Sequence, residues 1–227
     1  MAGENYYLLT ALPALPDFGG APPMDLAALL AHLSDAPAPR AQAEAIFLSD
    51  DLLQRDGVLA GESEQAAPAV LTSEQAAGEA PLPDFLAPGE EGPVPPEGRL
   101  RTEAVWAAYF RHAARLAGPA GFLAEWVRLE VGLRNALAAA RAKALDLDVE
   151  AYFVAPELGA PIEDFDEAVA AWSAASDPLA ALRALDGWRW ARLAERDRWF
   201  TFADDELAAY AAKLLLLCRW KRIEVRS

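Results

Sequence analysis

The sequence predicts an all-α fold, an irregular multi-helix bundle with a Pro/Gly-rich acidic linker. Of the 227 residues, 52 are alanine, the residue with the highest helix propensity. Valine, isoleucine and threonine together number only 17 residues, far fewer than a large β-sheet requires. Apolar residues also recur at helical spacing along most of the chain. A chain of this length can bury a substantial core and form one or two domains.

Residues 1–60 are expected to form an N-terminal helical segment. Asn5–Leu15 is aromatic and apolar, and could be a short helix or a strand, with a helix favoured. Met24–Ser34 and Ala41–Arg55 carry apolar residues at the spacing of an amphipathic helix. Within the latter range, Asp50 and Asp51 are expected to cap a second helical turn.

Residues 61–99 are expected to be an acidic linker or loop. This segment holds seven prolines, five glycines and a single basic residue. Proline lacks the backbone N–H and breaks helices, so a long helix is excluded here. One apolar patch, Leu82–Leu86, could still dock on the core. We therefore expect the segment to be dispensable for folding.

Residues 100–227 are expected to form a Trp-rich helical core domain. All seven tryptophans lie in this half, and buried aromatic area dominates core energetics. Helices are expected at Thr102–Ala117, Ala120–Leu145, Glu163–Ala175, Leu179–Asp186, Trp188–Phe200 and Glu206–Arg222. The longest of them carries an apolar stripe that is expected to be buried: Phe122, Trp126, Leu129, Leu133 and Leu137.

Charge and missing motifs exclude several function classes. With 35 acidic and 20 basic residues the net charge is −15, which argues against non-specific nucleic-acid binding. The sequence has neither a phosphate-binding glycine loop nor a GxSxG or HExxH motif, and its two histidines and single cysteine cannot build a common zinc site. We therefore expect no cofactor and no bound metal, and rank an enzyme of helical fold lowest among the alternatives.

No membrane-spanning or targeting segment is evident. The N-terminus lacks the basic and apolar regions of a signal peptide. The most apolar window, Leu207–Cys218, contains Lys213 and is shorter than the ~20 residues that a membrane span needs. We expect a cytoplasmic protein that reaches a membrane only through a partner.

One helix carries the candidate partner-binding residues. Glu130 and Arg134 are four residues apart and can form an ion pair, and Arg141 extends the same face. Asn135 is a poor helix former. Gly132 lowers the stability of a helix by about 1 kcal/mol relative to alanine, but it permits close approach of another element. Two interpretations remain open: an ion pair that fixes helix register inside the fold, or a groove that receives another chain.

Three segments of the chain also match motifs of a known family. An N-terminal segment fits the pattern YYxLxxLP, and a central one fits WxxxExxLRN. A C-terminal segment, which reads FxxxELxxYxxKL and is followed by RW, is similar to the pattern FxxExLxxYxxKL but places its glutamate one residue later. The residues that carry these matches include Tyr6, Tyr7, Leu12, Pro13, Trp126, Tyr210, Lys213, Arg219 and Trp220. In these motifs, which occur in order along the chain, the sequence resembles the bacterial domain-of-unknown-function family number 2764.

The resemblance implies a role in a rotary ATPase. Members of this family are typically encoded in operons for V/A-type ATPases, where the C subunit (called d in eukaryotes) is expected. The resemblance therefore implies a non-catalytic helical subunit whose partners are the rotor shaft subunits and the membrane ring. Through these partners the chain would lie peripheral to the inner membrane. The alternatives are a transient assembly or regulatory factor of the same ATPase, and a helical enzyme of unknown reaction.

Overall fold

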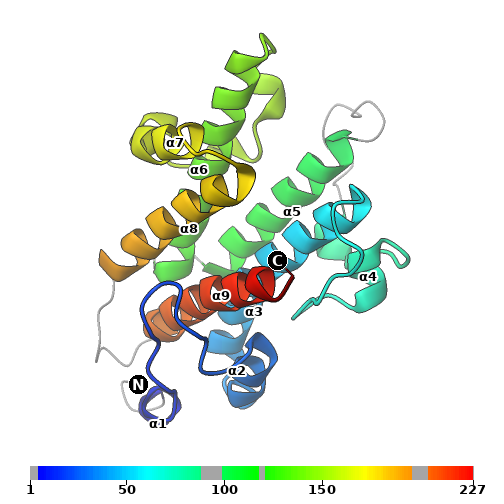
Figure 1. Cartoon of the computed structure of the whole chain (residues 1–227). Coiled ribbons are helices and arrows are strands. Elements are labelled where there is room, and N and C mark those ends of the chain that lie inside the picture. Colours follow the sequence, from blue (N-terminus) through cyan, green and yellow to red (C-terminus); the bar gives the residue numbers. More distant parts are fainter. Residues whose placement is uncertain (1–4, 88–98, 118–120, 196–203, 227) are drawn as a thin grey trace. The chain divides into compact units, whose positions relative to one another are not determined.

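The computed structural model describes residues 5–87, 99–117, 121–195 and 204–226 (Figure 1). Within these ranges every regular element is an α-helix or a short 3-10 helix, and no β-strand occurs, so the predicted all-α class is confirmed. The α-helices are α1 (Tyr6–Thr10), α2 (Leu26–His32), α3 (Pro37–Leu59), α4 (Ser73–Ala77), α5 (Arg99–Ala117), α6 (Phe122–Ala144), α7 (Asp166–Ser173), α8 (Pro178–Glu195) and α9 (Asp204–Arg226). The 3-10 helices are η1 (Asp84–Leu86), η2 (Glu150–Tyr152), η3 (Pro156–Leu158) and η4 (Ile162–Phe165).

The chain forms two structural units. Unit 1 combines Met1–Pro81 with Asp186–Ser227, and unit 2 is Leu82–Leu185. These bounds differ from the predicted ranges 1–60, 61–99 and 100–227, because α9 packs against α3 and so joins the two ends of the chain. Helix α8 has residues in both units, since it runs through the boundary at Leu185 and Asp186.

The core of unit 1 lies between α3 and α9. On α3, Ile46, Phe47 and Leu52 are almost completely buried. On α9 every residue from Leu207 to Leu217 is buried, so this helix is enclosed on all sides along that stretch. This stretch falls within Leu207–Cys218, the most apolar window of the sequence. Within the described ranges, however, no helix combines the length and hydrophobicity that crossing a bilayer requires.

The structure does not confirm an extended linker at residues 61–99. The carboxylate of Asp51 on α3 accepts hydrogen bonds from the backbone N–H groups of Ala69, Val70 and Leu71 at 2.8, 2.7 and 2.8 Å. Thr72 then begins α4 with a capping box. The side chain of Thr72 accepts a hydrogen bond from the backbone N–H of Gln75, and the side chain of Gln75 accepts one from the backbone N–H of Thr72. This part of the segment is therefore fixed on α3.

The later part of the same segment is also packed. Leu86, on η1, is fully buried, and Phe85 stacks on His112 of α5 with ring centroids 4.1 Å apart. Residues 88–98 lie outside the described ranges. Leu86 of the patch Leu82–Leu86 is thus part of the core of unit 2, and the expected dispensability of residues 61–99 for folding no longer follows.

The prediction that Asp50 and Asp51 cap a helical turn is wrong, because both lie inside the continuous helix α3 and are buried. Asp51→Ala should lower the free energy of unfolding by about 2 kcal/mol, since three backbone N–H groups lose their acceptor. Chemical denaturation followed by circular dichroism measures this loss. Asp35→Ala, at an exposed position, is the matched control and should change stability by less than about 0.5 kcal/mol. Equal effects of the two substitutions would contradict the anchoring role.

Candidate functional site

A buried charge cluster in unit 1 is the most distinctive polar feature of the described residues. It centres on Asp50 of α3, Asp186 of α8 and Arg219 of α9, which are 1%, 0% and 8% exposed. Buried charges carry a large desolvation penalty unless they are paired. We call these three residues, together with the surrounding Arg189, Trp220 and Arg222, the Arg219 cluster.

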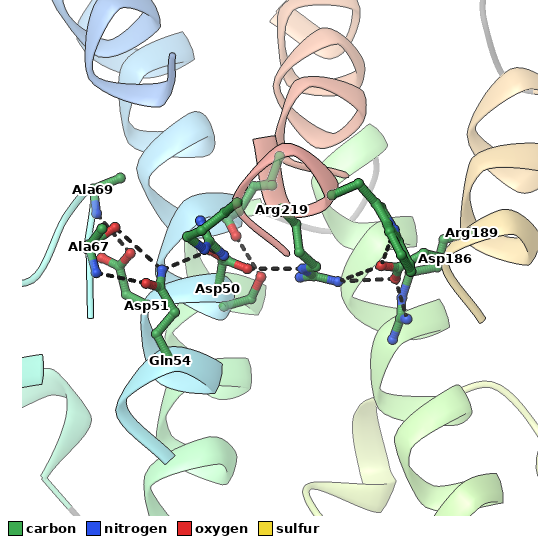
Figure 2. Close-up of polar contacts among 12 residues, drawn as sticks. Asp50, Asp51, Gln54, Ala67, Ala69, Asp186, Arg189 and Arg219 are labelled. Carbon is green, nitrogen blue, oxygen red and sulfur yellow. Dashed lines mark hydrogen bonds and ion pairs between the residues drawn. The ribbon is translucent and has the colours of Figure 1, made fainter. Parts of the chain in front are cut away.

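In this cluster one guanidinium group links two carboxylates (Figure 2). Arg219 Nε donates to Asp50 Oδ1 at 3.0 Å. Arg219 Nη1 donates to both oxygens of Asp186, at 3.0 Å to Oδ1 and 3.3 Å to Oδ2. Because each partner comes from a different helix, Arg219 connects α3, α8 and α9 within unit 1.

Further donors complete the hydrogen bonding of both carboxylates. Asp50 Oδ2 accepts from Arg222 at 2.6 Å and from Gln54 at 2.9 Å. Asp186 accepts from Arg189 at Oδ1, 3.0 Å, and from the indole N–H of Trp220 at Oδ2, 3.1 Å. All four carboxylate oxygens therefore accept at least one hydrogen bond, as buried carboxylates require.

The electrostatics keep Asp50 ionised. Burial disfavours its charged form, but Arg219 and Arg222 overcome that penalty and hold the pKa of Asp50 below its usual value. With its oxygens occupied by these donors, Asp50 is poorly placed to act as a general acid or base. The arrangement is that of a structural brace between helices rather than a proton-transfer site.

The structure brings the N-terminal and C-terminal family-motif residues together in unit 1. The hydroxyl of Tyr210 donates to the carbonyl oxygen of Pro13 at 2.9 Å, and burial raises the pKa of Tyr210 to about 12, so it remains a donor. Lys213 is 7% exposed, with Nζ 5.6 Å from the ring centroid of Trp190. Arg219 and Trp220 belong to the Arg219 cluster.

The other motif residues have different environments. Leu12 is half-buried, while Tyr6 and Tyr7 are exposed on α1. Trp126 lies in unit 2 and is buried, as its place in the predicted stripe requires. Phe202 of the C-terminal motif falls outside the described residues.

Asn135, one of the candidate partner-binding residues, has a structural role. It is 3% exposed, and its side-chain amide pairs with the backbone of Val154 in both directions. Nδ2 donates to the Val154 carbonyl at 3.1 Å, and Oδ1 accepts from the Val154 N–H at 2.8 Å. The amide therefore holds the chain's own 153–155 segment against α6.

Gly132 allows close approach of another element, as predicted, and that element is the chain's own η4. A Cβ atom at this position would lie 2.4 and 2.6 Å from ring atoms Cε2 and Cζ of Phe165, and 3.0 Å from the carbonyl oxygen of Ala160. Ala160 also donates its N–H to the Arg128 carbonyl at 3.0 Å. The face of α6 that bears Gly132 is covered from within unit 2 instead of forming an open groove there.

The remaining candidates lie elsewhere on α6. Glu130 and Arg134 are half-buried, and the guanidinium of Arg134 lies 4.1 Å from the ring centroid of buried Trp106. Arg141 is exposed, 5.0 Å from the ring centroid of Trp172, at cation–π distance. The ion pair between Glu130 and Arg134 remains a prediction.

Gly132→Ala should destabilise unit 2 by about 1–3 kcal/mol, because the added methyl group overlaps the ring of Phe165. Gly57→Ala on α3 is the matched control. A Cβ there meets only Ser63 Cβ, at 4.0 Å, so alanine should stabilise the helix by up to about 1 kcal/mol. Thermal denaturation of both variants measures the difference, and a stabilising effect at both positions would refute the close packing at Gly132.

Sequence reasoning missed most of the Arg219 cluster. The sequence predicts a helix cap at Asp50 and helix ends at Asp186 and Arg222, and it predicts no contact among these residues. The available signal was a charged residue within an apolar helical stretch, such as Asp50 between Phe47 and Leu52. Comparisons with protein-family models, curated proteins and solved structures find no match to this chain.

Proposed function

We propose that this chain is a non-catalytic subunit of a bacterial V/A-type rotary ATPase, coupling the central rotor shaft to the membrane ring in the manner of a C (d) subunit. The proposal rests on the resemblance of three motifs to those of a family encoded with such ATPases. One structural observation supports it. The first and last motifs are far apart in sequence, yet they meet in unit 1 through the hydrogen bond from Tyr210 to Pro13.

The character of the Arg219 cluster is compatible with mechanical coupling. A subunit that transmits torque needs helices that do not slide past one another. Arg219 links α3 and α8 to α9 through buried hydrogen bonds to Asp50 and Asp186. Buried polar groups fix packing register in some proteins. On this proposal the chain has no ATPase activity of its own, since its sequence contains no phosphate-binding loop.

The proposed partners are the rotor shaft subunits and the membrane ring, which would keep the protein cytoplasmic and peripheral to the inner membrane. The net charge of −15 favours basic segments of these partners and speeds their encounter. Salt weakens attraction between exposed charges. Binding to the shaft is therefore expected to be tighter at low ionic strength.

Co-purification with the rotor shaft tests the proposal. The tagged chain is co-expressed with the shaft subunits of the same organism, and the eluate is analysed for those subunits. We expect a complex that survives size-exclusion chromatography at low salt. A tagged acidic helical protein of similar size and charge is the control. Failure to retain the shaft subunits, or equal retention by the control, would contradict the coupling role.

A further inference from the structure

Tyr6 and Tyr7 form an exposed aromatic pair on α1. Their side chains are 47% and 78% exposed, and their rings meet edge to face with centroids 5.6 Å apart. No residue of α1 is buried. Tyrosine offers both an apolar ring and a polar hydroxyl, and it is enriched at protein interfaces. It is also enriched among the few interface residues that carry most of the binding energy.

Helix α1 is anchored although it buries none of its residues. Five residues are too few for a helix to be stable alone in water. The preceding Asn5 donates from Nδ2 to Asp204 Oδ1 at 2.6 Å, and His32 Nε2 donates to the Leu8 carbonyl at 2.9 Å. Just after the helix, Pro13 accepts the hydrogen bond from Tyr210. The tyrosine pair is thereby preorganised, which reduces the entropy lost when a partner binds.

The surroundings of the pair are acidic. The hydrogen bond from Asn5 places the start of α1 beside the first turn of α9, which carries Asp204, Asp205 and Glu206. Lysine and arginine are attracted by such carboxylates and also pack on tyrosine rings through cation–π contacts. An anionic membrane surface would instead be repelled.

We propose that the Tyr6–Tyr7 pair and the acidic first turn of α9 form a docking surface for a basic, apolar segment of a partner protein. Exposed rings supply the apolar contact, and the neighbouring carboxylates select positive charge. This inference goes beyond the proposed function, because the chemistry of the bound segment follows from the surface whichever assembly provides it.

A binding titration tests the docking surface. The probe is a fluorescent synthetic amphipathic helix of leucine and lysine, and a leucine–glutamate helix of equal length is the charge control. The full chain is compared with the double variant Tyr6→Ser/Tyr7→Ser. The matched control is Leu145→Ser/Val225→Ser, which removes two side chains of similar exposure, 66% and 81%, far from α1 in sequence. Circular dichroism verifies that each variant retains the helical fold.

We expect the leucine–lysine helix to bind the unmodified chain and the tyrosine variant to bind at least about tenfold more weakly. The Leu145→Ser/Val225→Ser variant should bind as the unmodified chain does, and the leucine–glutamate helix should not bind. No binding to the unmodified chain, or equal weakening in both variants, would overturn the inference. Tyrosine-dependent binding to anionic lipid vesicles would overturn it in favour of a membrane contact. Because the probe is synthetic, none of these outcomes depends on the rotary ATPase proposal.

Discussion

Arg219→Met is expected to lower the free energy of unfolding of unit 1 by about 3–5 kcal/mol, since removing one partner of a buried ion pair leaves charge uncompensated. Arg219 is the residue that both Asp50 and Asp186 share. Methionine approximates the length of the aliphatic stem but supplies no donor. Urea denaturation followed by tryptophan fluorescence measures the loss directly.

Arg192→Met is the matched control for this substitution. The side chain of Arg192 is 41% exposed, and its ion pair with Glu195 at 3.1 Å is accessible to solvent. Exposed pairs contribute about 0–1 kcal/mol, so this variant should remain close to the unmodified chain. A loss at Arg219 no larger than that at Arg192 would show that the cluster does not brace the helices.

The stabilisation by the cluster should depend on pH in one direction. The pKa of Asp50 is lowered in the folded state. The contribution of ionised Asp50 to the free energy of unfolding is therefore complete above the ordinary aspartate pKa of 3.8, and it decreases as the pH falls toward the folded-state pKa. The stability difference between the unmodified chain and the Arg219→Met variant should therefore shrink below about pH 4. A difference that grows on acidification would contradict the ionised state of the cluster.

Leu133→Ala is expected to destabilise unit 2 by about 2–5 kcal/mol, the cost of a cavity at a fully buried leucine. Leu133 is 0% exposed at the centre of α6. Leu137→Ala, one turn further along the same helix, is the matched control. Leu137 is only half-buried, so its loss should be distinctly smaller. Thermal denaturation of the two variants measures both losses. Equal losses would contradict the assignment of Leu133, and not Leu137, to the fully buried side of α6.

The comparison of these two leucines also shows what periodicity can predict. The helical spacing located α6 to within two residues at each end, Phe122–Ala144 against the expected Ala120–Leu145. It also placed Trp126 and Leu133 in the core, where they are buried. Leu129 and Leu137 of the same stripe are only half-buried, because periodicity gives the side of a helix but not how far its neighbours extend over it.

The expected break between two helices at residue 187 illustrates a weak local signal. The sequence predicts helices at Leu179–Asp186 and Trp188–Phe200, whereas α8 runs without interruption from Pro178 to Glu195. A glycine within a helix costs about 1 kcal/mol relative to alanine, which packing of the neighbouring turns readily offsets. Gly187 therefore lies inside the helix and does not end it.

The Arg219 cluster and the anchored 69–71 segment could not be derived from local patterns. Arg219 meets Asp50 across 169 residues of sequence and Asp186 across 33. Asp51 binds backbone groups 18 to 20 residues ahead of it. Spacing rules relate residues within a few turns, so a carboxylate whose partners come from another segment is indistinguishable in sequence from one that caps a helix.

The composition of purified rotary ATPase from the organism that encodes this chain tests the central claim most directly. If the chain couples the rotor shaft to the membrane ring, it is present in the intact complex in stoichiometric amount, and deleting its gene uncouples ATP hydrolysis from ion transport. An intact ATPase that contains no copy of this chain, and whose coupling is unchanged by the deletion, would contradict that role and favour a transient assembly factor.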